Sequence, residues 1–323
     1  MNGRGAGEGT MKSKRNQQRY EIIFRKTLLL SALMVPCAGL HAQSKFPDHC
    51  GSASLPFAGI EVKHPIDGKC GLTGAAQAPA NSQLQNKAKN NFCAGAGNKQ
   101  PETVTVQSLT DLQGKTTVPS GYQKEPASRA PLQALGEGKL VRIKAFVYEA
   151  HHADLGSGES VNCKGKAELD NDVHIALVAQ AKGQECESVT AEISPHFRPD
   201  SWNLIGHDEK YNSRTKNYTP DPAMEAKLKG HPFRITGQLF FDASHQLCPC
   251  GVACTPVRAS LWEIHPVYGI EVCAPGTQCD ENKDADWIAF DKWWAGNPAP
   301  GPAPVTRPPH KHLPHDAPAG SGR

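Results

Sequence analysis

The chain lacks the short motifs that identify many enzymes from sequence alone. It contains no G-x-S-x-G turn for a serine nucleophile, no glycine-rich loop for phosphate binding and no H-E-x-x-H pair for zinc. No internal repeat is visible either. No motif therefore indicates a reaction, and function must be argued from the fold and from the side chains that the fold would bring together.

The apolar run near the N-terminus is too short to span a bilayer comfortably. It reads "TLLLSALMVPCAGLHA" (27–42), follows a basic stretch and ends in small residues, as in a secretory signal peptide cleaved after Ala42. Translation would start at Met1 or Met11. We expect a signal peptide over 1–42, export to the periplasm or the medium, and no transmembrane segment after cleavage.

The excess of positive charge belongs to this leader. Residues 1–42 hold seven of the 35 Lys and Arg residues and two of the 32 Asp and Glu residues, so the remainder has a formal net charge of −2. A chain of this charge does not favour a nucleic-acid partner.

Cysteine is frequent after the leader, and its count is even. An even, high count in an exported chain predicts disulfides. Because the number before residue 100 and the number after residue 160 are both odd, complete pairing requires at least one bridge between these parts. The ten residues are Cys50, Cys70, Cys93, Cys163, Cys186, Cys248, Cys250, Cys254, Cys273 and Cys279.

Composition divides the mature chain into four parts. A Cys-rich segment (43–100) and a polar connector (101–138) precede a strand-rich domain (139–295). The connector contains one short β-like stretch, "TVTV", and room for a helical turn. The Pro-rich tail (296–323) has almost no large apolar residues, so we expect it to be disordered.

The strand-rich domain has the pattern of a five-stranded barrel. The five β-runs are "KLVRIKAFVYEA", "DVHIALVAQ", "SVTAEISP", "HPFRITGQLFFD" and "RASLWEIHPVYGIEV". A short helix in "PAMEAKLKG" falls between the third run and the fourth. This order predicts a mainly β fold with an OB-like barrel, in which Gly237 suits a bent strand. The aromatic stretch "DADWIAFDKWWAG" predicts a short helix covering one end.

Five segments together resemble a family of uncharacterised secreted bacterial proteins over roughly residues 45–275. They are "HPIDGKCG", "QNKAKNNFCAGAG", "DVHIALV", "FRITGQLFFDASH" and "SLWEIHPVYGIEVC", which carry the HPID…C, QN-x-AKNNFCA and WEIHPV motifs. That family has no known activity. The resemblance therefore implies only that the Cys-rich segment and the barrel belong together.

Two acid-x-His pairs are the sharpest chemical feature. Asp172 and His174 lie two apart in the second run, and Glu263 and His265 lie two apart in the fifth, so each pair shares one strand face. Together they offer two imidazoles and two carboxylates, which suit a divalent metal or acid–base catalysis. The alternative is the solvated face of a half-wet sheet, with Val173, Ile175, Trp262 and Ile264 on the buried face.

Two further groups have both a chemical and a structural interpretation. His196, Arg198 and Trp202 follow the third run and suit an anionic or planar ligand, or a salt-bridged loop; His151 ends the first run near the barrel mouth. His245 with Cys248, Cys250 and Cys254 suits a soft metal, although disulfides are favoured in an oxidising compartment, with neither cysteine of the C-x-C pair bonded to the other.

Two function classes follow. The first is a secreted or periplasmic binding module, held together by disulfides, for a glycan, a peptide or another envelope component. The second is a metal-dependent hydrolase of the phosphodiesterase or nuclease kind that uses Asp172, His174, Glu263 and His265. Whether the two imidazoles converge distinguishes these classes.

Overall fold

The computed structural model describes residues 71–75, 80–91, 93–94, 100–121, 124–153, 158–196, 198–206, 210–212, 217–219, 222–248 and 258–296. The predicted signal peptide and all of the tail beyond Gly296 lie outside the described residues. Within these ranges, no helix has both the length and the apolar character needed to cross a membrane.

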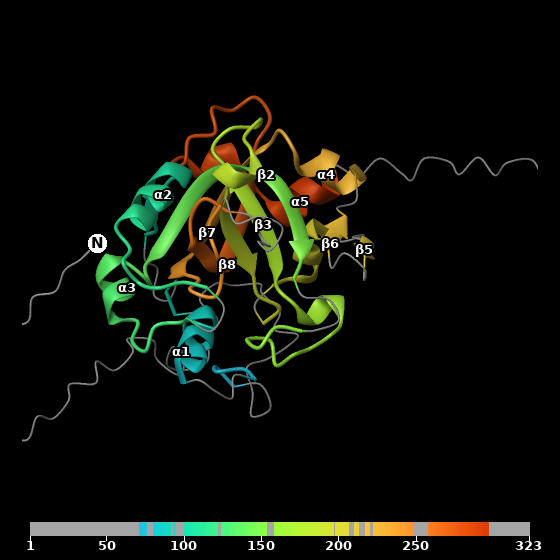
Figure 1. The fold of residues 1–323 in the computed structure, drawn as a ribbon. Helices are drawn as coiled ribbons and strands as arrows, with labels where there is room; N and C mark the ends of the chain where they lie inside the picture. Colours follow the sequence, from blue (N-terminus) through green and yellow to red (C-terminus); the bar gives the residue numbers. More distant parts are fainter. Residues whose placement is uncertain are drawn as a thin grey trace, which may run out of the picture. The chain divides into compact units, whose positions relative to one another are not determined.

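Five strands close into a barrel (Figure 1). They are β2 (Leu140–His152), β3 (Val173–Val178), β4 (Val189–Ile193), β7 (Pro232–Phe241) and β8 (Trp262–Cys273). The strand order is β2-β3-β4-β8-β7, and β7 pairs with β2 to complete the circle. The β4–β8 pair is parallel, whereas the other four barrel pairings are antiparallel.

This order confirms the predicted mainly β, OB-like barrel. All five predicted β-runs form barrel strands, and the helix expected between the third and the fourth is α4 (Pro222–Leu228). The chain leaves this helix through Gly230, which has a φ of +82° that suits glycine.

Short strands and helices flank the barrel. β1 (Glu102–Val104) runs parallel to β2, and β9 (Trp287–Ala289) pairs with the end of β8. β5 (Lys210–Asn212) and β6 (Asn217–Thr219) form a separate two-stranded sheet. The α-helices are α1 (Ala80–Lys89), α2 (Val106–Gly114), α3 (Ala130–Leu135), α4 and α5 (Phe290–Gly296), and the 3-10 turns are Glu168–Asp170, Glu185–Glu187, Asp200–Ile205 and Asp284–Asp286.

Helix capping corrects the extent of the "TVTV" strand. β1 ends at Val104 because Thr105 caps α2: its hydroxyl accepts from the Ser108 backbone N–H, and the Ser108 hydroxyl accepts from the Thr105 N–H. Val106 and Leu109 of α2 then pack into the core. The local capping bonds thus outweigh the β preference of the alternating Thr and Val residues.

The barrel interior is apolar, as the alternation predicts. Val173, Ile175 and Leu177 of β3 and Trp262 and Ile264 of β8 belong to one buried hydrophobic cluster. α2 and α5 add residues to the same cluster. Fully burying one such side chain contributes about 1.5–3 kcal/mol, so the interior is the main source of the barrel's stability.

Gly237 and Pro266 mark the bend in the β7–β8 pair. The register shifts on both sides of Gly237. A Cβ at Gly237 would lie 2.4 Å from Ile264 Cγ2 and 2.5 Å from the Pro266 carbonyl oxygen, which only glycine avoids. The β7–β8 pair is therefore bulged beside His265, and β8 lies between β4 and β7 in the sheet.

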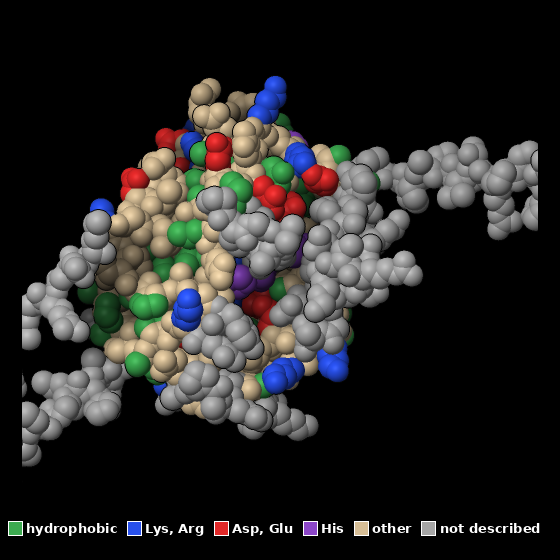
Figure 2. All heavy atoms as spheres, in the orientation of Figure 1, with side chains coloured by type: hydrophobic (Ala, Val, Ile, Leu, Met, Phe, Trp, Pro, Cys, Tyr) green, Lys and Arg blue, Asp and Glu red, His purple; other side chains and the backbone are tan. Residues whose placement is uncertain are grey.

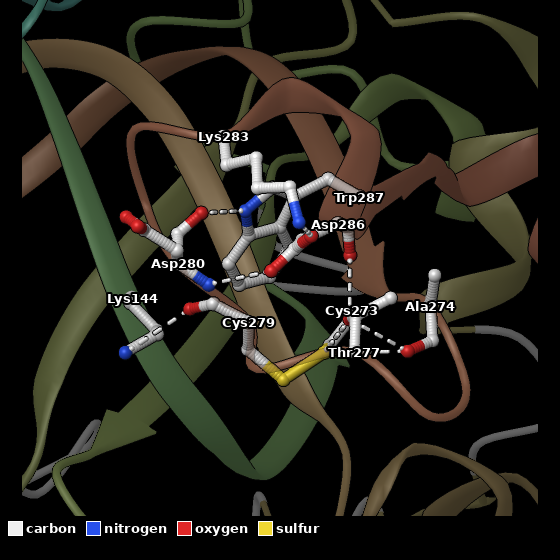
Figure 3. Close-up of a disulfide and its surroundings, with 9 residues drawn as sticks. All are labelled: Lys144, Cys273, Ala274, Thr277, Cys279, Asp280, Lys283, Asp286 and Trp287. Carbon is white, nitrogen blue, oxygen red and sulfur yellow. Dashed lines mark hydrogen bonds and ion pairs between the residues drawn. A yellow bond between two sulfur atoms is a disulfide. The ribbon is translucent and has the colours of Figure 1, made fainter.

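The covering helix is shorter than the aromatic pattern predicts. Trp287 and Ile288 belong to β9, because this segment pairs with the end of β8, and the helix begins at Phe290. A disulfide between Cys273 and Cys279 closes the loop before β9 (Figure 3). Trp287 Nε1 donates to the Asp280 carbonyl oxygen at 2.7 Å within this loop.

Disulfide bonding is confirmed for the cysteines that the structure describes. Cys186 pairs with Cys248, so Cys248 does not bond to Cys250, as the close C-x-C spacing predicts. Cys93 and Cys163 are also disulfide-bonded. The remaining predicted cysteines, Cys50, Cys70, Cys250 and Cys254, lie outside the described residues.

Candidate functional site

The two acid-x-His pairs converge on one carboxylate, Glu192 of β4. His265 Nδ1 lies 2.5 Å from Glu192 Oε2, and His174 Nε2 lies 3.2 Å from Glu192 Oε1. His265 Nε2 points toward Asp172 Oδ2 at 3.9 Å. Side chains from β3, β4 and β8 thus meet on the face of these strands that is turned away from the apolar interior.

This face is not solvated, which corrects the alternative that the sequence favours. Asp172, Glu192, Glu263 and His265 are fully buried, and His174 retains 6% exposure. We call the set that gathers here the polar cluster. Its members are Lys89, His151, Glu159, Asp172, His174, Glu192, Asp242, Arg258, Glu263 and His265.

The N-terminal segment is the cover that strand alternation does not predict. Ala88 packs on Phe240 of β7, and Gln238 donates to the Ala88 carbonyl oxygen at 2.9 Å. Asn91 hydrogen-bonds to the Gln238 side chain, and Tyr268 donates its hydroxyl to the Asn91 carbonyl oxygen at 2.5 Å. α1 and the residues after it therefore close the outer face of the barrel.

Strand register aligns three members of the cluster. His151 of β2 pairs with His174 of β3, and His174 pairs with Glu192 of β4. The two imidazole rings meet edge to face with centroids 5.5 Å apart. His151 is thus brought beside the acid-x-His pairs, although the sequence placed it only near the barrel mouth.

Asp172 enters from the end of the loop between β2 and β3. Asn162 donates to its Oδ1 at 3.0 Å, and the Asp172 backbone N–H donates to Glu159 Oε2 at 3.0 Å. Within the part of the chain that the structure describes, Asp172 Oδ2 accepts no hydrogen bond and His265 Nε2 makes none, although both atoms are buried. A carboxylate oxygen and an imidazole nitrogen, both of which could bind a metal ion, thus face each other without a hydrogen bond between them.

Asp242 and Glu263 add two further carboxylates beside Glu192. Lys89 Nζ lies 3.3 Å from Glu192 Oε2 and 3.2 Å from Asp242 Oδ2. Asp242 also holds His245, whose Nδ1 lies 2.7 Å from Asp242 Oδ2. Arg258 donates from Nη1 to Glu263 Oε2 at 2.5 Å, and its Nη2 lies 3.9 Å from Glu192 Oε1.

Negative charge exceeds fixed positive charge in the polar cluster. Five carboxylates lie around Lys89 and Arg258, and Arg198 adds positive charge beside Asp172 and Glu159. Carboxylates thus outnumber the permanently positive side chains among the described residues, and buried charge without a partner is costly.

The pKa shifts follow this arrangement. Burial opposes the protonation of His265, but Glu192 and Glu263 outweigh burial and raise its pKa to about 10. Burial lowers the pKa of His151 to about 4 and holds the pKa of His174 well below its usual value. Burial and the neighbouring Asp172 raise the pKa of Glu159 well above its usual value.

Asp172, Glu192 and His265 can hold a metal ion. Ligand atoms of these three residues lie within 4.8 Å of one another, as do those of Glu192, Asp242 and Glu263. Ions such as Zn²⁺ bind oxygen and nitrogen at about 2.0–2.2 Å, which places two ligand atoms roughly 3–4 Å apart.

The other predicted ligand-binding residues lie outside the polar cluster and make contacts within the fold. Arg198 donates to the backbone carbonyl oxygens of Asn171, Ile193 and Leu169, and burial lowers its pKa to about 10. Trp202 packs in the hydrophobic core, and His196, which precedes it in the same loop, is also buried. Cys248 is oxidised and His245 binds Asp242, so neither supports the soft-metal site proposed for "HQLCPCGVAC".

Sequence reasoning missed Glu192, Lys89, Asp242 and Arg258. For Glu192 a signal existed, because it alternates with apolar residues in the third β-run as Asp172 does in the second. Lys89 carries no such signal, since its position depends on how α1 packs against strands more than a hundred residues away.

The edge of the cluster approaches the surface. Figure 2 shows histidine and acidic atoms in a recess on the face turned toward the viewer. His151 and His174 are the histidines of the cluster that retain exposure, at 7% and 6%. Comparisons with protein-family models, with curated proteins and with solved structures return no significant match, so the geometry alone must carry the functional argument.

Proposed function

We propose that the protein is a metal-dependent hydrolase whose divalent cation is held by Asp172, Glu192 and His265. The observation that carries the proposal is the facing pair of Asp172 Oδ2 and His265 Nε2, which are 3.9 Å apart, buried and without hydrogen bonds among the described residues. The excess of carboxylates over permanently positive side chains around the polar cluster adds to it. These features call for a cation that the protein side chains do not supply.

A bound divalent cation would supply Lewis acidity and an acidified water. His174 lies at the exposed edge with its Nε2 3.2 Å from Glu192, so it is placed to exchange a proton beside the cation site. Arg258 is fully buried with its Nη2 3.9 Å from Glu192 Oε1, so its charge supports the carboxylates around the proposed cation. Phosphodiesters are the substrate class to test first, because divalent ions stabilise the attacking and leaving oxygens of phosphoryl displacement.

The position in the fold agrees with this proposal. OB-type barrels bind oligonucleotides and oligosaccharides on the face of their second and third strands and on adjacent loops. Here those strands are β3 and β4, which carry His174 and Glu192, and the adjacent loop ends at Asp172. This support is an analogy of fold, and the same fold hosts many functions.

We also propose that the protein is exported to the periplasm or the medium. The disulfides support this location, because such bonds persist in oxidising compartments. The leader-like sequence of residues 1–42 gives the route.

A binding module for a glycan, a peptide or another envelope component is the second candidate. The deep burial of the polar cluster favours it, because a large substrate reaches only the edge at His151 and His174. In this case the cation would order the binding face and would not act on a bond.

Elemental analysis after dialysis, together with hydrolysis of bis(p-nitrophenyl) phosphate, tests the proposal. We expect at least one tightly held divalent ion and metal-dependent turnover, both lost in Asp172→Asn and His265→Gln. Thr190→Ala, on the same face of β4, is the control and should retain both. A retained ion without turnover of phosphate, ester or glycoside probes would favour the binding module. Absence of any retained or added ion on the folded protein would overturn the proposal.

A further inference from the structure

Lys89 lies where a second cation would be expected. Its ammonium contacts Asp242 Oδ2 and Glu192 Oε2 at 3.2 and 3.3 Å, and the side chain is buried. Glu192, Asp242 and Glu263 form the second group with metal-ligand spacing. The ammonium thus belongs to a set of carboxylates that meets the geometric requirement for an ion.

Glu263 supplies an independent sign that this group is built for a cation. Its Oε2 accepts from Arg258, but its Oε1 is buried and accepts no hydrogen bond from any described residue. The nearest nitrogen recorded for that atom is His265 Nδ1, at 3.6 Å. A carboxylate oxygen without a donor in a buried acidic group is a free ligand position.

Glu192 belongs to both groups. In two-metal hydrolytic sites the ions lie about 3.5–4 Å apart and share ligands. Glu192 is likewise shared by the two groups here, and an ammonium at the end of α1 contacts the second group. An ammonium is a compact point charge with three donors, so it can replace an ion among carboxylates without fixing their geometry.

We propose that Lys89 occupies the second of two adjacent cation positions, so that the protein binds one divalent ion and its own N-terminal segment supplies the other positive charge. This inference rests on the proposed metal site. It assigns α1 a role in the site itself, since removing the ammonium would leave Glu192, Asp242 and Glu263 open to an ion.

Metal stoichiometry of Lys89→Ala tests the inference, with Lys89→Arg as the control that keeps the charge. Titrated with Mn²⁺, the wild type and Lys89→Arg should bind one ion, and Lys89→Ala should bind two. The paired ions should show spin coupling in electron paramagnetic resonance, because they would lie a few ångströms apart. Adding Asp242→Asn to Lys89→Ala should return the count to one.

The other outcomes are also decisive. One ion in Lys89→Ala, or two in the wild type, would overturn the inference while leaving the hydrolase proposal intact. If Lys89→Ala requires Mn²⁺ to fold and then holds two ions, the inference is supported; if it fails to fold even with Mn²⁺, the inference is overturned. No ion in the wild type but one in Lys89→Ala would support the second position and contradict the first.

Discussion

The two faces of the same barrel strands differ in chemistry but not in burial. On β3, Ile175 faces the interior and His174 the outer face; on β8, Ile264 and His265 do the same. All four side chains are nearly or fully inaccessible to solvent. A polar residue that alternates with apolar ones is therefore not always at the surface, because a separate segment can cover it.

The two faces also differ in how they affect stability. The interior gains free energy from each apolar group removed from water. The outer face loses solvation for every charge and recovers it only through partners such as Lys89 and His265 around Glu192. Substitutions on the two faces should therefore differ in their dependence on metal and pH.

The largest effect is expected from Glu192→Ala on the outer face. Removing this carboxylate leaves His265, His174 and Lys89 without their shared partner, which costs about 3–5 kcal/mol for a broken buried ion pair. Thr190→Ala, two residues away on the same face, should cost only about 1 kcal/mol. Urea unfolding measures both; a loss below that of the control would show that Glu192 is not the centre of the cluster.

An intermediate effect is expected from Ile175→Ala in the interior. Deleting a buried isoleucine side chain costs roughly 2–4 kcal/mol, whereas Leu169→Ala, at a residue 49% exposed, should cost less than about 0.5 kcal/mol. Added divalent ion should stabilise Ile175→Ala as much as the wild type but should not stabilise Glu192→Ala. Equal responses of the two variants to metal would remove the distinction between the faces.

The smallest effect concerns Glu149 of β2. Burial, together with Glu185 and Glu225, raises its pKa to about 7, although Lys229 opposes the shift. The folded state then binds the Glu149 proton more tightly than the unfolded state does. The contribution of Glu149 to the free energy of unfolding is therefore full below pH 4.5 and is lost as the pH rises to 7. Because the side chain is 24% exposed, we expect a change on the order of 1–2 kcal/mol.

Thermal unfolding from pH 4 to 8 checks this prediction. Glu149→Gln should lose that part of the pH dependence, and Glu102→Gln, at an exposed carboxylate, should keep it. An unchanged profile in Glu149→Gln would place the titration elsewhere.

Local patterns account for most of the fold and for half of the site. The five strands, their apolar faces and the shared faces of Asp172 with His174 and of Glu263 with His265 follow from spacing within single segments. The cover does not, because α1 has no apolar stripe that marks a docking face; its buried side chains include Gln85, Asn86 and Lys89. Contacts such as Lys89 to Asp242 depend on the closed barrel and leave no periodic trace in the sequence.

The long chain separation within the polar cluster has a consequence for how the protein folds. Lys89 and Glu192 are 103 residues apart, and His265 lies 73 residues beyond Glu192. Contacts at such separations form late, because the intervening chain must lose its conformational freedom first. The cluster is therefore complete only when β8 has joined the barrel and α1 has docked. Under the proposed metal binding, ion uptake would then report on finished molecules, and partly folded chains would carry no activity.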